Sequence, residues 1–88
     1  MIAIEITEEF IRRFAALPPP VRRQAQKKWA LFRENPFHTS LQTEKLHPKQ
    51  RELWSFRINR QYRIIFRFID GSTALFLTCG PHSWIYRI

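Results

Sequence analysis

The sequence predicts an α+β fold, in which an N-terminal strand and a helical hairpin pack on one face of a mainly antiparallel sheet, in the order β-α-α-β-β-β. Three observations support this prediction. A short alternating run opens the chain, two stretches with apolar residues at helical spacing follow, and from residue 53 onward the pattern changes to a period of two. Because the chain has 88 residues, we expect residues 1–88 to form a single domain.

The first strand and helix are predicted from the start of the chain. Residues 2–6 read Ile-Ala-Ile-Glu-Ile, an alternating run that is typical of a strand. Thr7 is a residue type that caps helices, and Glu8 and Glu9 follow in the first turn, where the helix dipole favours acidic side chains. The prolines at 18–20 end this helix, and Pro20 suits the start of the next one.

The second helix is predicted from one apolar stripe at helical spacing, made of Val21, Ala25, Trp29 and Phe32. Its opposite side carries basic residues, namely Arg22, Arg23, Lys27 and Arg33. This helix should end at Asn35, because a residue that precedes a proline is pushed out of the helical conformation.

The rest of the chain predicts an irregular segment at 37–52 and strands at 53–58, 62–69 and 72–79, with a short final strand at 83–88 as a further option. Asp70-Gly71 predicts a two-residue hairpin turn with positive φ at both turn positions. The register that follows pairs Ile69 with Ser72, Arg67 with Ala74, Ile65 with Phe76 and Arg63 with Thr78. A symmetric turn at 59–61 would place Arg57 opposite Arg63.

This register divides the strands into two faces. The face that the helices should cover holds Trp54, Phe56, Ile58, Tyr62, Ile64, Phe66, Phe68, Leu75, Leu77 and Cys79. The other face holds Ser55, Arg57, Arg63, Ile65, Arg67, Ala74, Phe76 and Thr78.

The charge of the chain indicates a polyanionic partner. It contains 15 Lys and Arg against 7 Asp and Glu, a net charge of +8. A surplus of Arg favours bidentate recognition of phosphate, although a solvated basic surface or an acidic protein partner fits the same charge. We expect no contact with a membrane, since no apolar run approaches the ~18 residues of a membrane span and the start does not resemble a signal peptide. A single Cys suits a reducing compartment, so we expect a cytoplasmic protein.

The paired arginines are the first candidate for a functional site. Two cations directly opposite each other across a ladder destabilise a sheet, so Arg57 and Arg63 are most simply explained by an anion that binds between them. The alternative is that these arginines, with Arg67, only extend into solvent.

His82 and Tyr86 lie near the end of the last predicted strand. An imidazole transfers protons near neutral pH, so His82 beside an arginine face could donate a proton to the leaving oxygen of a phosphodiester. Tyr86 could stack on a base. The alternatives are a structural or merely exposed His82 and ordinary packing of Tyr86.

Other chemistries find no support in the sequence. The His, Cys and acidic residues lack the spacing of a metal site, so we expect no metal and no cofactor. RNA supplies its own nucleophile, the 2′-OH, and can be cleaved without a metal by positioning, charge stabilisation and proton transfer.

Several segments, in their order along the chain, resemble the RelE/ParE superfamily of toxin–antitoxin toxins. They are Phe14…Leu17-Pro18, Asn35-Pro36, Leu41…Lys45-Leu46, Trp54-Ser55-Phe56-Arg57-Ile58, Tyr62-Arg63-Ile64-Ile65-Phe66 and the ending Gly80-Pro81-His82…Tyr86. The resemblance implies the β-α-α-β-β-β fold, an mRNA endonuclease that cuts in the ribosomal A site, and a cognate antitoxin that is usually acidic.

The resemblance also implies roles for single residues. Arg63 falls on the arginine that contacts the scissile phosphate in RelE-like members, and Arg57 falls near an assisting basic position. The ending is similar to that of the YafQ-like branch, in which the residue matching His82 is the general acid and the residue matching Tyr86 is the terminal aromatic. This chain has Trp54-Ser55-Phe56 where RelE-like members have catalytic lysines. The general base is therefore unassigned, with His47 and Glu44 as candidates.

The residues predict metal-independent cleavage of RNA, and the resemblance implies that the substrate is mRNA on the ribosome. The residues expected to be catalytic are Arg63, His82, Arg57 and Tyr86, and those expected to bind RNA are Arg67, Lys45, Lys49, Arg22, Arg23 and Lys27. The expected partners of the protein are mRNA, the ribosome and an antitoxin, with a toxin–antitoxin heterotetramer as one assembly. Two alternatives stay open: a ParE-like inhibitor of DNA gyrase that is not an enzyme, and an inactive member that serves in a repressor complex with its antitoxin.

Overall fold

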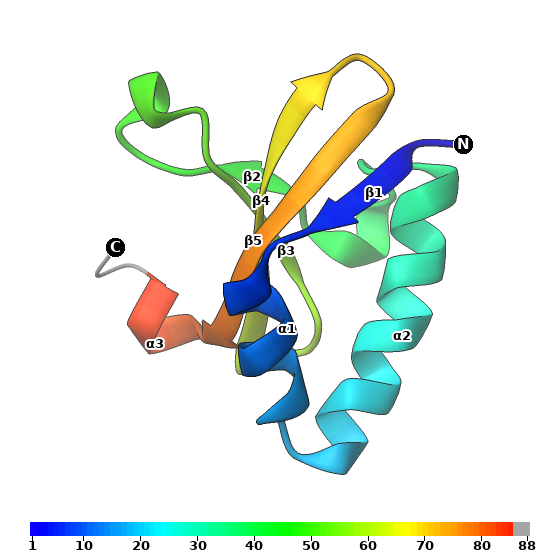
Figure 1. Ribbon diagram of the computed structural model, residues 1–88, viewed down its shortest axis with the longest axis vertical. Helices are drawn as coiled ribbons and strands as arrows, with labels where there is room; N and C mark the ends of the chain where they lie inside the picture. The colour runs from blue at the N-terminus through cyan, green and yellow to red at the C-terminus, as the bar shows by residue number, and fades with distance from the viewer. Residues whose placement is uncertain (86–88) are drawn as a thin grey trace.

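The structure, a computed structural model, describes residues 1–85 (Figure 1). The chain forms a five-stranded sheet in the order β1-β5-β4-β3-β2, in which β1 runs parallel to β5 and the other neighbours are antiparallel. The predicted α+β fold is confirmed. The elements are β1 (Ala3–Ile6), α1 (Glu8–Ala15), α2 (Pro19–Glu34), β2 (Glu44–Lys45), β3 (Trp54–Arg57), β4 (Tyr62–Asp70), β5 (Thr73–Pro81) and α3 (His82–Ile85).

The cap of the first helix and the end of the second lie where the sequence predicts, and the second helix begins one residue before the predicted Pro20. The Thr7 hydroxyl accepts a hydrogen bond from the backbone N–H of Phe10 and donates one to the carbonyl of Leu77, so it caps α1 and ties the helix to β5. The second helix starts at Pro19, with Pro18 as its cap residue, and Asn35 ends it. Figure 1 shows both helices on one side of the sheet.

An aromatic core joins these helices to the sheet. Phe32 of α2 is fully buried, and its ring centroid lies 4.9 Å from those of Phe56 and Phe66 and 5.2 Å from that of Phe76. Burial of side chains of this size is the main term that stabilises a small domain. We call the side of the sheet that packs on α1 and α2 the helix face, and the opposite side the far face.

The predicted hairpin turn is wrong by one residue. Asp70 pairs with Thr73, so the turn residues are Gly71 and Ser72, and neither Asp70 nor Gly71 has a positive φ. The Asp70 carboxylate instead accepts hydrogen bonds from the N–H of Ser72 (2.8 Å) and from its hydroxyl (3.0 Å), which fixes a turn through a side chain. These hydrogen bonds, the backbone one first, lower the pKa of Asp70.

A bulge in β5 and a second irregularity between Phe68 and Asp70 of β4 replace all the predicted register pairs of these two strands. Phe66 pairs with Phe76 while Ile65 pairs with Thr78, so Leu77 is an extra residue. The observed pairs in place of the predicted ones are Arg67 with Leu75, Phe68 with Ala74, Ile65 with Thr78 and Arg63 with Gly80.

The bulge also moves four residues to the other face. Ala74 and Phe76 are buried in the core with α1 and α2, not on the far face. Leu75 lies opposite Arg67, and Leu77 packs against a far-face cluster, so neither of them belongs to the helix face. The other assignments of the predicted faces agree with the structure, and Arg57 does pair with Arg63.

Two further segments differ from the prediction. The irregular segment 37–52 contains a short strand, β2, between two 3₁₀ turns at Thr39–Leu41 and Lys49–Arg51. The end of the chain forms α3 rather than a final strand over residues 83–85, while residues 86–88 lie outside the described part. Trp84 of α3 packs against Leu46, Leu53 and Ile65 on the far face.

Candidate functional site

The two arginines lie side by side on the far face. Arg57 of β3 and Arg63 of β4 are register partners, and Gly80 of β5 is the next residue in the same row. Their neighbours in sequence, Phe56 and Ile64, point into the core, so alternation turns both arginines away from the helices. The structure therefore places two arginines opposite each other on adjacent strands.

The two guanidinium groups differ in their hydrogen bonds. Arg63 is 9% exposed, and its Nη1 donates to the carbonyls of Asn59 (2.9 Å) and Tyr62 (3.3 Å) in the turn between β3 and β4. Arg57 is half-buried, and its Nε is buried without a hydrogen-bond partner. A buried donor of this kind is uncommon in a folded protein, and a bound acceptor would satisfy it.

His82 lies at the end of the sheet that carries this row. It follows directly after Pro81, which pairs with Tyr62, and its backbone N–H donates to the carbonyl of Gln61 (2.6 Å). Its side chain lines a pocket of about 390 Å³ with Arg60, Gln61, Tyr62, Pro81 and Ser83. We call this space the His82 pocket.

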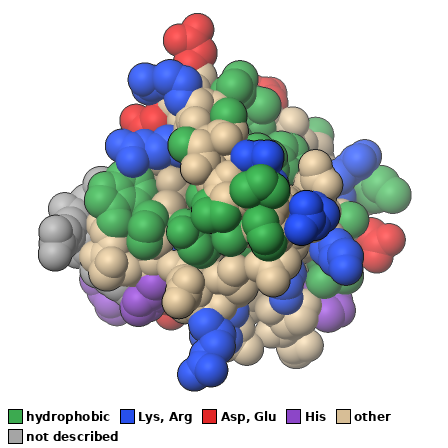
Figure 2. Space-filling view, turned by 90° about the horizontal axis from the view of Figure 1, so that it is seen from below, with side chains coloured by type: hydrophobic (Ala, Val, Ile, Leu, Met, Phe, Trp, Pro, Cys, Tyr) green, Lys and Arg blue, Asp and Glu red, His purple; other side chains and the backbone are tan. Residues whose placement is uncertain are grey.

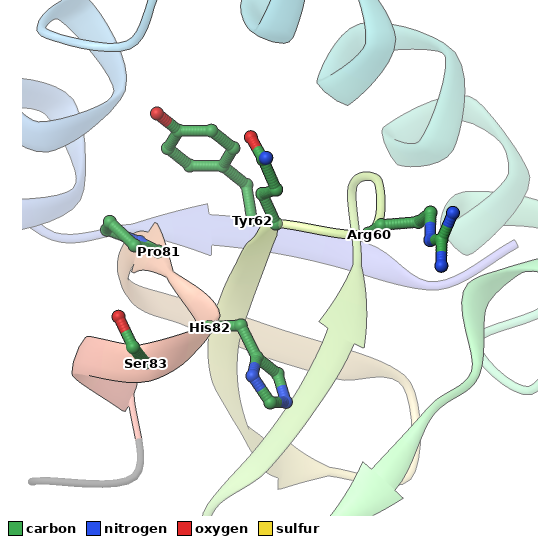
Figure 3. Close-up of a pocket in the computed structure, with 6 residues that line it drawn as sticks. Arg60, Tyr62, Pro81, His82 and Ser83 are labelled. Atoms are coloured by element: carbon green, nitrogen blue, oxygen red, sulfur yellow. The ribbon is translucent and has the colours of Figure 1, made fainter.

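Figure 3 shows how the side chains of the His82 pocket point. The Tyr62 ring points toward α1 and α2, whereas the imidazole of His82 points to the other side of the sheet, and Arg60 points away from both. His82 thus shares the far side with Arg57 and Arg63, although neither arginine lines its pocket.

Trp84 covers the row of arginines at its β5 end. A Cβ atom built on Gly80 would lie 2.7 Å from Cε3 of Trp84, so this indole rests directly on the glycine backbone. The guanidinium carbon of Arg13 lies 4.7 Å from the centre of the same indole ring. The predicted site residue Tyr86 lies outside the described residues.

The residues expected to bind RNA occupy three different regions, one of which is α2. Arg67 and Lys49 are exposed near the far end of β3 and β4, where Nη2 of Arg67 donates to the carbonyl of Arg51 (3.1 Å). Lys45 pairs with Glu52 (3.3 Å) and lies over Trp54, which is a helix-face residue. The structure therefore separates Lys45 from the arginine row.

The three basic residues expected on α2 are not equivalent. Arg23 and Lys27 are exposed. Arg22 is half-buried, and its Nη1 donates to the carbonyl of Ala15 (3.0 Å) at the end of α1 and to that of Leu17 (2.7 Å) in the turn that follows. The first contact satisfies a carbonyl that the helix end leaves unpaired and the second holds the turn, so Arg22 has a structural role.

The two candidate bases lie near β2. Glu44 pairs with Ser55, which faces the far side, so Glu44 lies on the same face as the arginines. His47 is exposed in the segment after β2. The structure adds Tyr62, Arg60 and Pro81 to the site, and the pairing of Tyr62 with Pro81 is the signal that could have revealed them.

The remaining chemistry of this region is limited. The Cys79 thiol is buried, and burial raises its pKa to about 11 while Arg13 opposes the shift. Over residues 1–85 no three His, Cys, Asp or Glu side chains lie close enough together to hold a metal ion. No helix in the same part of the chain is long and apolar enough to cross a membrane.

Solved structures of toxins share this fold. YafQ from Escherichia coli has a TM-score of 0.76 and 11% identity, covering 98% of this chain and 99% of that one. The YoeB/ParE toxin from Agrobacterium tumefaciens has a TM-score of 0.74 and 16% identity, covering 92% and 99%. The archaeal RelE–RelB complex from Pyrococcus horikoshii has a TM-score of 0.73 and 17% identity, covering 91% of this chain and 93% of that one. At these identities the similarity shows the fold alone.

Sequence comparison identifies the family. No curated protein sequence matches the chain. Residues 33–82, which are more than half of the chain and include Arg57, Arg63 and His82, match the family described as the RelE-like toxin of the type II toxin–antitoxin system HigB. The chain therefore belongs to the HigB-like family of RelE-like type II toxins.

Proposed function

We propose that this toxin is a metal-independent endoribonuclease that cleaves mRNA in the ribosomal A site and so inhibits translation. The observation that carries the proposal is the register pair of Arg57 and Arg63 on the far face, together with the buried, unpaired Nε of Arg57. A phosphodiester group held over the far face at these two strands would accept hydrogen bonds from both guanidinium groups.

The arginines would act on the transition state. Attack of a 2′-oxygen on the adjacent phosphorus adds negative charge to the phosphate oxygens, and two cations on a rigid sheet stabilise that charge without having to reorganise. Arg63 is held by backbone carbonyls of Asn59 and Tyr62, so its position is fixed before RNA binds. Preorganisation of this kind lowers the barrier rather than only strengthening binding.

His82 would act as the general acid. In the proposed step the 2′-oxygen loses its proton and forms a bond to phosphorus, the bond from phosphorus to the 5′-oxygen breaks, and the imidazolium of His82 protonates that leaving oxygen. The products are a 2′,3′-cyclic phosphate and a 5′-hydroxyl. Glu44, on the same face of the sheet, is a candidate acceptor for the 2′-proton.

The partner of the toxin would be an acidic antitoxin. Two of the solved relatives that share its fold are complexes of RelE with RelB, from Pyrococcus horikoshii and Methanococcus jannaschii. The net charge of +8 favours a partner of opposite charge, and the ribosome is likewise polyanionic. A toxin that acts on ribosomes works in the cytoplasm.

Primer extension on a cellular message tests this function. Induction of the wild-type toxin should produce breaks within codons, whereas His82→Ala and Arg57→Gln should reduce them by at least about 100-fold. His38→Ala and Arg12→Gln are matched controls, because both side chains are exposed and lie outside the site, and they should cut as the wild type does. Unchanged breaks in His82→Ala would refute the assignment of the general acid, and absence of breaks with the wild type would refute the activity.

A further inference from the structure

A second pocket adjoins the His82 pocket on the other side of the sheet end. It has a volume of about 220 Å³ and lies between the turn that joins α1 to α2 and the ends of β4 and β5. Tyr62 and Pro81 line both pockets. We call the second space the Tyr62 pocket. The two pockets therefore meet at Tyr62 and Pro81, at the end of the sheet.

The lining of the Tyr62 pocket suits a flat, apolar ligand with a negative charge beside it. Ala16, Leu17 and Pro18 supply apolar surface, and Tyr62 supplies an aromatic side chain. Arg13 lies at the same pocket, and Arg60 lines the His82 pocket. No carboxylate lines either pocket among the described residues.

The surface at this end of the molecule carries both apolar and basic side chains (Figure 2). Figure 2 looks at the end of the molecule where α2 begins, and it shows hydrophobic side chains gathered at the centre with Lys and Arg side chains around them. An apolar or aromatic surface bordered by cations is the pattern by which proteins hold single-stranded nucleic acid, since bases stack on the former and phosphates contact the latter.

We infer that the Tyr62 pocket receives the base of a nucleotide adjacent to the cleaved linkage, with Arg13 contacting the neighbouring phosphate. This inference rests on the proposed function, because it takes the His82 pocket as the place of cleavage. The directions of the side chains in Figure 3 agree with it, since Tyr62 at the start of β4 and His82 after the end of β5 point to opposite sides of the sheet. An RNA strand would therefore pass around Pro81.

The volume of the pocket suits one base better than a larger ligand. Sites for drug-sized molecules measure roughly 300–1,000 Å³, and about 220 Å³ is below that range. The toxin would thus recognise the cleaved linkage and a single flanking base on this side, and the shape of the pocket would contribute to the choice of sequence.

Binding of modified RNA tests the inference. The probe is a fluorescent hexaribonucleotide in which every ribose is 2′-O-methylated, so that it cannot be cleaved, and in which an abasic residue replaces each position in turn. Affinity is measured by fluorescence anisotropy at low salt. For the wild-type toxin, one abasic position should weaken binding roughly 5- to 150-fold, the value of one stacked base.

Two variants should abolish that dependence. Ala16→Phe fills the pocket from an exposed position, and Tyr62→Leu removes the aromatic ring while keeping apolar volume, so both should bind the intact and the abasic RNA equally. Ala30→Phe is the matched control, because Ala30 is exposed on α2 outside the pocket, and it should behave as the wild type.

The ionic contact has its own measurement. Arg13→Gln should reduce the slope of log affinity against log salt concentration by about 0.7, the value for one phosphate contact on a single strand. Melting curves by circular dichroism show whether each variant is folded. If Tyr62→Leu does not fold, the comparison of Ala16→Phe with the wild type tests the inference.

The outcomes separate the inference from the proposed function. If every abasic position weakens the wild type and Ala16→Phe equally, or if the wild type binds no probe, the inference is wrong. If binding depends on Ala16 and Tyr62 but the wild type produces no breaks by primer extension, the pocket holds a base and the endonuclease proposal fails. If the wild type and Ala16→Phe cut the same sites at the same rates, the endonuclease proposal is supported and the inference of a base pocket is wrong.

Discussion

Replacement of Arg22 by Ala separates a structural role from a role in RNA binding. Nη1 of Arg22 donates to two carbonyls, that of Ala15 at the end of α1 in an exposed contact and that of Leu17 in the following turn in a partly buried one. A hydrogen bond from a charged donor contributes about 1.5–3 kcal/mol when it is shielded from water, and the exposed contact adds less. We therefore expect Arg22→Ala to lower the free energy of unfolding by about 1.5–3 kcal/mol.

Urea denaturation followed by circular dichroism measures this change. The melting temperature should fall by roughly 4–8 °C for each kcal/mol of unfolding free energy that is lost. Arg23→Ala is the matched control, since Arg23 is exposed on the next position of the same helix, and its stability should stay within about 0.5 kcal/mol of the wild type. Equal stabilities of the two variants would refute the structural role. A loss of RNA affinity in Arg22→Ala without any loss of stability would return Arg22 to the RNA-binding set.

Three other predictions follow from packing and burial. Burial raises the pKa of Cys79 to about 11, so roughly one-thousandth of this thiol should be thiolate at pH 8. Cys79 should therefore react with iodoacetamide far more slowly in the folded protein than in the urea-unfolded chain, and equal rates would contradict its burial. Gly80→Ala places a methyl group against Trp84, so it should change the tryptophan fluorescence and reduce cleavage, while an unchanged spectrum would show that the indole does not rest there. Thr7→Ala removes the cap of α1 and the hydrogen bond to Leu77, so it should cost about 1–2 kcal/mol of unfolding free energy, and a change within about 0.3 kcal/mol would contradict both contacts.

Local signals in the sequence predicted most of the fold. The cap at Thr7, the prolines before α2 and the apolar stripe along that helix each act within a few residues, so the printed sequence contains the information they need. The pairing of Arg57 with Arg63 was also predictable, because the strands flank a short turn.

The register of β5 could not be predicted in the same way. A bulge depends on how Phe66 and Phe76 pack against α2 across the sheet, and nothing in the local sequence marks Leu77 as the extra residue. The prediction of the hairpin turn was wrong for a related reason. The carboxylate of Asp70 stabilises a different turn from the one that Asp-Gly favours.

The candidate site also contains features that the local sequence predicts and features that depend on tertiary contacts. The arginine row depends on strand alternation and was predicted, whereas the separation of Lys45 from that row and the structural contacts of Arg22 depend on tertiary neighbours. The place of Tyr62 between two pockets depends on its pairing with Pro81, which the erroneous register had hidden.

Analysis of the cleaved ends on purified, programmed ribosomes tests the central claim most directly. The account predicts that the upstream fragment ends in a 2′,3′-cyclic phosphate, that the downstream fragment begins with a 5′-hydroxyl, and that His82→Ala and Arg57→Gln each slow the single-turnover rate by at least about 100-fold. Fragments with a 3′-hydroxyl and a 5′-phosphate, or rates that are unchanged in both variants, would contradict it.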